Sequence, residues 1–166
     1  MGDSASVTQK TADLNRATLR FGLPTMLAPL LPRSDRWGRI KAEVVCSMSS
    51  RYAISLYEAV RLRANLDRCI EVIPIDKFRD ILSVPPGAYV NGANFAAKVL
   101  EPAVTECNGL SDISVKIELK RRHPRAPIES VVMVWWKKDA EELAAVIREL
   151  GKSKLGRMER LKGAGL

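Results

Sequence analysis

The sequence has few of the residues on which metal sites and disulfide bonds depend. Among its 166 residues there is one histidine, His123, which excludes any site that requires two histidines. The three cysteines, Cys46, Cys69 and Cys107, are too widely spaced to form a metal-binding or redox pair. We therefore expect no metal, no cofactor and three reduced, mostly buried thiols in a cytoplasmic protein.

Long apolar runs and catalytic constellations are also missing. No stretch approaches the roughly 18 consecutive apolar residues of a membrane-spanning helix, and the polar N-terminus lacks the apolar centre of a signal peptide. Gly151 and Lys152 suggest a phosphate-binding loop, but that motif requires a further glycine where Val146 stands. No carboxylate pair and no nucleophile beside a base stands out. The sequence predicts no enzyme, no membrane partner and no small-molecule substrate.

Positive charge is what the sequence has in excess. Lysine and arginine number 27 against 19 aspartates and glutamates, which gives a formal net charge of +8. The hydrophobic share of 46% is ordinary, and the length suits one folded domain with extensions. An excess of this size favours an anionic partner, nucleic acid before a membrane surface.

Helical periodicity appears in three segments. The segment "SSRYAISLYEAV" predicts a first helix, in which a serine serves as N-cap. Its apolar side chains recur on one face, namely Tyr52, Ala53, Leu56, Tyr57 and Val60. Residues 74–82 predict a second helix and residues 91–108 a third, in which Pro102 should cause a kink or a weak first half. Gly109 is expected to cap the third helix.

Period-two alternation predicts the strands. Residues 69–73 form a short expected strand between the first two helices. Residues 113–122 alternate strictly between apolar and polar side chains, and residues 128–136 return as a second strand. The turn between them, residues 121–127, is basic, so the pair predicts a hairpin with a charged tip.

The segments around these elements complete the predicted organisation. Asp139 and Glu142 predict a capping box for a further helix that ends near Gly151, and strands are expected at 17–23 and 39–48. The expected domains are a disordered N-terminal tail (1–16), a strand-rich extension (17–46), a winged-helix domain (47–150) and a basic flexible tail (151–166).

The order of elements is helix, strand, helix, turn, helix, hairpin, which is the order of a winged helix. The predicted fold class is therefore α+β, a winged helix-turn-helix with three core helices, a β-hairpin wing and an added C-terminal helix. The third helix would enter the major groove, and the wing would lie over the phosphates. A winged helix used for protein contacts is the alternative.

Three segments resemble the plasmid replication initiator proteins that carry tandem winged helices. "SSRYAISLYEAV" resembles their Ser-x-Tyr-Ala-x-x-Leu-Tyr-Glu signature, and "IDKFRDIL" resembles their second helix. "NFAAKVLEPAVTECN" resembles their Phe-x-x-x-Val-Leu-x-Pro-Ala-x-x-Glu-x-Asn helix, Pro102 included. The hairpin strands follow in the same order, so the resemblance covers about residues 47–138.

The resemblance implies a function in plasmid DNA replication. Family members bind repeated origin sequences with both winged helices and dimerise through the first, whereas this length accommodates only the second, with residues 17–45 resembling the end of the first. The implied partners are double-stranded DNA at plasmid origin repeats, a second copy of the chain and host replication proteins. A winged-helix transcriptional regulator is an alternative reading, as is a protein-interaction winged helix that has lost DNA binding.

The predicted contact surface departs from the family pattern. Ala96 and Ala97 stand where the family often has a basic run, and Ser55 stands where it often has arginine. Base recognition then depends on Asn91 and Asn94, each able to donate and accept at an adenine edge, although helix capping is an equal alternative for Asn91. The candidate DNA-binding residues are Arg51, Asn91, Asn94, Ala97, Lys98, Lys120, Arg121, Arg122, His123 and Arg125.

The expected roles of the cations differ. At the wing tip, residues 120–125, the arginines suit phosphate because the planar guanidinium donates two parallel hydrogen bonds. Arg51 stands at the start of the first helix, where free backbone N–H groups would help it hold a phosphate. A solvated charged turn is the alternative interpretation of the wing tip.

Overall fold

The computed structural model describes residues 6–8, 18–20, 38–66, 68–124 and 126–163, and the chain divides into two units, 1–35 and 36–166. In the first unit β1 (Ser6–Thr8) pairs antiparallel with β2 (Thr18–Arg20), with Val7 opposite Leu19. Strand β1 lies within residues 1–16, the tail that was predicted to be disordered. The other residues of the tail lie outside the described ranges.

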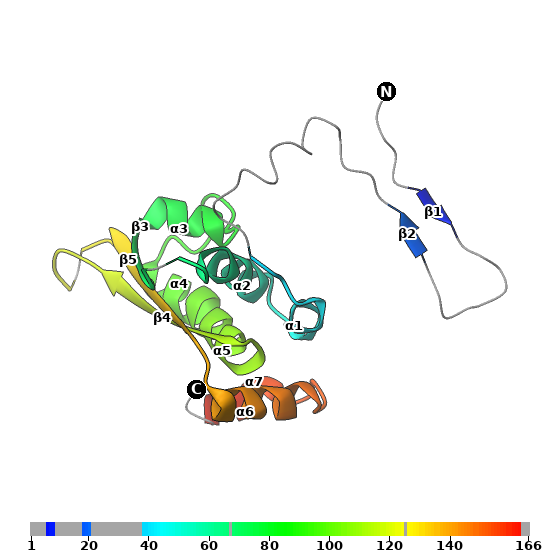
Figure 1. Ribbon diagram of the computed structural model, residues 1–166. Coiled ribbons are helices and arrows are strands. Elements are labelled where there is room, and N and C mark those ends of the chain that lie inside the picture. Colours follow the sequence, from blue (N-terminus) through cyan, green and yellow to red (C-terminus); the bar gives the residue numbers. More distant parts are fainter. Residues whose placement is uncertain (1–5, 9–17, 21–37, 67, 125, 164–166) are drawn as a thin grey trace. The chain divides into compact units, whose positions relative to one another are not determined.

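In the second unit, the first of the three predicted core helices follows the sequence prediction closely (Figure 1). Helix α2 (Arg51–Arg63) begins after Ser50, whose side chain accepts a hydrogen bond from the Tyr52 amide at 3.2 Å. The predicted apolar face is buried, namely Tyr52, Ala53, Leu56, Tyr57 and Val60. Burial of each large side chain contributes about 1.5–3 kcal/mol, so this face anchors the core. Strand β3 (Ile70–Pro74) then leads into α3 (Ile75–Ile81).

The third helix is continuous but not uniform. It consists of α4 (Gly92–Phe95), the π-helical turn η2 (Ala96–Leu100) and α5 (Glu101–Leu110). Pro102 lies in the first turn of α5, directly after the π turn. A proline lacks the amide hydrogen and its ring crowds the carbonyl four residues earlier, so the wider turn accommodates it. The irregularity predicted from Pro102 is therefore present as a π turn.

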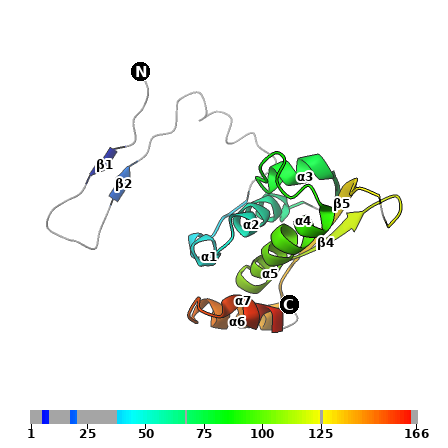
Figure 2. The ribbon, with the colours of Figure 1, turned by 180° about the vertical axis from the view of Figure 1, so that it is seen from behind.

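The sheet has three antiparallel strands in the order β3-β5-β4, formed with β4 (Ile113–Lys120) and β5 (Ser130–Lys137). Val115 is opposite Trp135, and the Trp135 side chain is buried. The neighbouring Trp136 points to the other face, where it is 43% exposed. The sheet lies along one side of α4 and α5, and the β4–β5 hairpin extends beyond the helices in both views (Figures 1 and 2). This is the predicted winged-helix arrangement.

Two polar side chains of α5 explain the Glu-x-Asn part of the family motif. The buried Glu106 carboxylate accepts hydrogen bonds from the backbone amides of Ser49 at 3.0 Å and Ser50 at 3.1 Å. The Asn108 side chain bonds both the amide (2.8 Å) and the carbonyl (3.0 Å) of Val115. Glu106 thus ties the third helix to the start of α2, while Asn108 occupies the outer edge of β4 as a neighbouring strand would.

A flexible tail was predicted at 151–166, but residues 151–163, the part of it that the structure describes, are ordered. Helix α6 (Ala140–Leu150) has the predicted capping box, in which Asp139 and Glu142 each bond the other's amide. A further helix, α7 (Arg157–Gly163), then packs beneath α5 with Leu161 buried. A run of lysine, arginine and glycine resembles a solvated tail in sequence, but here it contains one apolar anchor.

Gly109 provides the place for that anchor and does not cap the helix as predicted. The helix continues to Leu110, and Ser111 is its C-cap. A Cβ atom on Gly109 would lie 2.3 Å from Cδ2 of Leu161, so only glycine allows this approach.

The prediction of a strand at 39–48 is also wrong. Residues 42–47 form the short helix α1 (Ala42–Ser47), and Val44 enters the core. The backbone amide of Lys41 donates to Tyr57 Oη at 3.2 Å, which fixes the segment against α2. The compact unit therefore starts earlier than the expected boundary at residue 47.

The cysteines differ from expectation as well. Cys107 is buried, whereas Cys46 and Cys69 are exposed, so the prediction of mostly buried thiols is wrong. Burial raises the pKa of Cys107 to about 12, which keeps its thiol protonated at neutral pH. Within the described part of the chain, no helix is long and apolar enough to cross a bilayer.

Candidate nucleic-acid interface

The side of the third helix that faces away from the core is open to solvent. Phe95 and Val99 are buried against the other helices, while Asn94, Ala97 and Lys98 are exposed. All three exposed residues were predicted from the sequence as contact residues. The third helix therefore has one face that another molecule can reach.

Asn91 serves as the N-cap of this helix. Its Oδ1 accepts hydrogen bonds from the amides of Ala93 at 2.8 Å and Asn94 at 3.3 Å. A bidentate contact with adenine would require the same oxygen. The structure thus favours capping, the alternative that the sequence left open for Asn91.

Asn94 and Lys98 are free to bind a ligand. Within the described residues, the Asn94 carboxamide has no hydrogen-bond partner and the Lys98 ammonium forms no ion pair. One supplies a paired donor and acceptor, and the other supplies a positive charge one turn later. These are the polar groups available on the front half of the helix.

The base of the wing packs directly against the first turn of this helix. A Cβ atom on Gly92 would lie 2.8 Å from Nη2 of Arg121 and 2.9 Å from Cδ1 of Ile128. Arg121 also donates from Nη1 to the carbonyl of Ala126 at 2.9 Å, within the hairpin loop. The absence of a side chain at Gly92 therefore lets the wing and the helix form one continuous surface.

The other predicted wing residues that the structure describes are exposed and partly paired. Lys120 lies 3.2 Å from the Glu118 carboxylate, and Arg122 lies 2.6 Å from that of Glu129. Lys120 and then Lys116 lower the pKa of Glu118. Exposed pairs of this kind are weak, so a phosphate can replace the carboxylate partner. His123 is also exposed, and Arg125 lies outside the described residues.

Arg51 belongs to a cluster that joins the first helix to the turn before the third. Its guanidinium lies 4.8 Å from the centre of the Tyr52 ring and donates to Tyr52 Oη at 2.8 Å, which lowers the pKa of Tyr52. The Tyr52 ring contacts Tyr89 edge to face at 6.2 Å. Arg51 is exposed, so the cluster ends in an accessible cation.

Arg79 and Tyr89 position the third helix and were not identified from the sequence. Arg79 donates to the carbonyls of Ala88 and, at 3.3 Å, Tyr89, and its guanidinium lies 4.9 Å from the centre of the Phe95 ring. Tyr89 has φ 51, a conformation that side chains rarely adopt. Pro85, Pro86 and Gly87 are residues that favour a turn here, but no local pattern indicates that an arginine of α3 would hold it.

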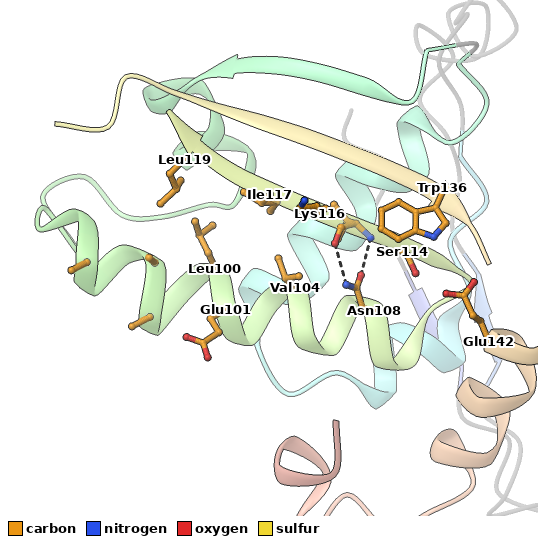
Figure 3. Close-up of a pocket in the computed structure, with 14 residues that line it drawn as sticks. Leu100, Glu101, Val104, Asn108, Ser114, Lys116, Ile117, Leu119, Trp136 and Glu142 are labelled. Atoms are coloured by element: carbon orange, nitrogen blue, oxygen red, sulfur yellow. Dashed lines mark hydrogen bonds between the residues drawn. The ribbon is translucent and has the colours of Figure 1, made fainter. Parts of the chain in front are cut away.

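A groove runs between the third helix and the outer edge of β4, where Asn108 bonds Val115 (Figure 3). It has a volume of about 770 Å³, and its walls are mainly apolar. Leu100 and Val104 project toward Ile117 and Leu119 across it, and Trp136 stands at one end. Ala93 and Ala97, on the exposed face of the third helix, also line this groove, together with residues of β4.

One comparison with known proteins concerns the part of the chain that forms this surface. Residues 74–133 match the family model described as "Initiator Rep protein, WH2". Over this stretch, the chain is similar to an initiator Rep winged helix. This match confirms both the winged-helix fold and the resemblance to replication initiators. The match to the initiator Rep winged helix runs from the end of β3 into β5, and therefore includes α3, the third helix and the wing. Among curated proteins, none matches the chain.

Proposed function

We propose that this protein initiates plasmid DNA replication by binding repeated double-stranded sites at an origin in a sequence-specific manner. The family match supports a role in replication initiation. The formal charge of +8 supports an anionic partner. In this proposal the protein acts in the cytoplasm, together with a second copy of itself and with host replication proteins.

The proposed binding mode follows from the two parts of the surface. The third helix enters the major groove, where Asn94 contacts a base edge and Lys98 contacts the backbone. Arg121 and Arg122 bind phosphates from the wing, with Lys120 and His123 beside them. Arg51 binds a further phosphate at the start of α2.

The contact between Arg121 and Gly92 carries the proposal. It joins an open helix face to a cluster of cations on one side of the domain. An exposed helix or a charged turn alone is common on protein surfaces. Their close packing fits a duplex, whose groove and phosphates lie side by side.

The test is a footprint on the DNA that flanks the gene. An initiator should protect direct repeats spaced by about two helical turns, because each copy must bind the same face of the duplex. A second arm places the gene and its flanking DNA on a plasmid without another origin. Replication of that plasmid separates an initiator from a transcriptional regulator, which would protect DNA without supporting replication.

One observation favours a second candidate function, protein binding. The groove is mainly apolar and adjoins the outer edge of β4, the kind of edge to which some domains add a strand. If the footprint shows no protected DNA of any sequence, a protein-contacting winged helix becomes the better interpretation.

A further inference from the structure

The exposed face of the third helix has an unusual shortage of polar groups. Val90, directly before the helix, is 81% exposed, and Ala93 and Ala97 lie exposed on the following turns. Asn94 and Lys98 are the polar side chains between them. This face can form few hydrogen bonds to base edges, but it presents several methyl groups.

The position of Val90 is fixed by the surrounding contacts. Arg79 holds the carbonyls of the two preceding residues, and Asn91 caps the helix immediately after it. Val90 lines a hollow of about 310 Å³ together with Gly92 and Arg121. The branched apolar side chain of Val90 is therefore exposed to solvent in an ordered turn, next to Arg121 of the wing.

The major groove has one apolar group that matches such a face. The 5-methyl group of thymine projects into it, and apolar side chains recognise thymine by contact with that group. The neighbouring cations favour duplex DNA over an apolar peptide as the occupant of this face, because they complement phosphates. The exposed Glu101 carboxylate repels phosphates farther along the helix, which confines the contact to residues 90–98.

We propose that Val90, Ala93 and Ala97 contact thymine methyl groups, so that the protein selects duplexes with thymines at fixed positions of the major groove. This inference depends on the proposed function, since it requires the third helix to enter the groove. It assigns specificity to apolar side chains where a basic run is missing.

The experiment replaces thymine by uracil, which lacks only the methyl group. A duplex retained by the full chain from a random-sequence pool is resynthesised with deoxyuridine for thymidine, one position at a time. We expect about fourfold weaker binding for each contacted methyl, the value for burial of one carbon group. The salt dependence should remain the same, because the phosphates are unchanged. Equal binding of every substituted duplex overturns the inference and leaves the proposed function intact.

A pair of matched variants locates the contact. Val90→Ser should bind the thymine and uracil duplexes equally at one position, while retaining the discrimination elsewhere. Val72→Ser is the control, because Val72 is 63% exposed on the face of β3 that points away from the core. If Val90→Ser keeps the full methyl dependence, the assignment of Val90 is wrong. Failure of the wild-type chain to retain any duplex overturns both proposals.

Discussion

Two basic segments of this protein are similar in sequence and opposite in structure. The wing tip, residues 120–125, directs its described cations into solvent, where Arg122 has a side chain that is 82% exposed. The C-terminal segment, residues 151–163, contains Arg157, which is 6% exposed. Arg157 donates to backbone carbonyls, including that of Ser47 at 3.0 Å, and forms part of the interior.

The difference arises from one buried carboxylate. Glu149 lies 2.6 Å from Arg160, 3.4 Å from Lys152 and 3.5 Å from Arg157, so three cations of the C-terminal segment surround this one carboxylate. The wing has only the exposed carboxylates Glu118 and Glu129. A cluster of positive charge in sequence therefore indicates a nucleic-acid surface only when no buried acceptor lies within its reach.

The largest expected effect tests whether the C-terminal segment belongs to the core. Leu161→Ala should lower the free energy of unfolding by about 2–5 kcal/mol, because it leaves a cavity against Gly109. Urea denaturation measures this change. Lys162→Ala, an exposed change in the same helix, is the matched control and should have almost no effect. A small loss for Leu161→Ala would mean that α7 does not contribute to the fold.

The second prediction concerns the wing. Changing both Arg121 and Arg122 to Ala should weaken binding to all duplexes alike and flatten the salt dependence by about one unit of slope per lost phosphate contact. Binding isotherms at several salt concentrations measure both effects. Arg148→Ala, an exposed change on α6, should leave the slope unchanged. An unaltered slope in the double variant would reject the wing as a phosphate-binding element.

The third prediction separates the helix from the wing. Asn94→Ala should remove about 1–3 kcal/mol of discrimination at one base pair, since its free carboxamide is the candidate base contact. Competition between single-base variants of the selected duplex provides the measurement. An equal loss on random DNA would show that Asn94 contributes no sequence preference.

The smallest expected effect addresses Glu149 itself. The hydrogen bond from Arg160 lowers the pKa of Glu149, so the folded state is stabilised above the ordinary glutamate pKa and loses this contribution as the pH falls through the folded value. Glu149→Gln should therefore cost about 1 kcal/mol at neutral pH and little in acid. Unfolding at pH 7 and pH 3 tests this, with the exposed Glu141→Gln as control. A cost that is equal at both pH values would contradict the linkage.

Much of the fold followed from local patterns. The buried face of α2, the capping box at Asp139 and the alternation in β4 each depend on residues within one element, and each was predicted correctly. The errors have a common origin in distant contacts. Residues 42–47 are helical because Val44 enters the core, and α7 is ordered because Gly109, far earlier in the chain, leaves room for Leu161.

The candidate site was predictable in the same uneven way. The exposed positions Asn94 and Lys98 followed from helical periodicity once the third helix was located. The roles of Arg79 and Tyr89 did not, because they arise from a strained turn held by a neighbouring helix. Val90 gives a weak indication in the sequence. It is an apolar residue between a turn and a helix cap, a position from which a side chain is not expected to enter the core.

The π turn at Ala96–Leu100 has a consequence for how this surface can evolve. One residue of an α-helix corresponds to about 100° of rotation, and a π turn contains one more residue than an α turn. Deleting a single residue there would restore an α turn, and Phe95 and Val99 would then be three residues apart, still on one face of the helix. The surface can therefore change in length by one codon at this turn while Phe95 and Val99 keep their places in the core.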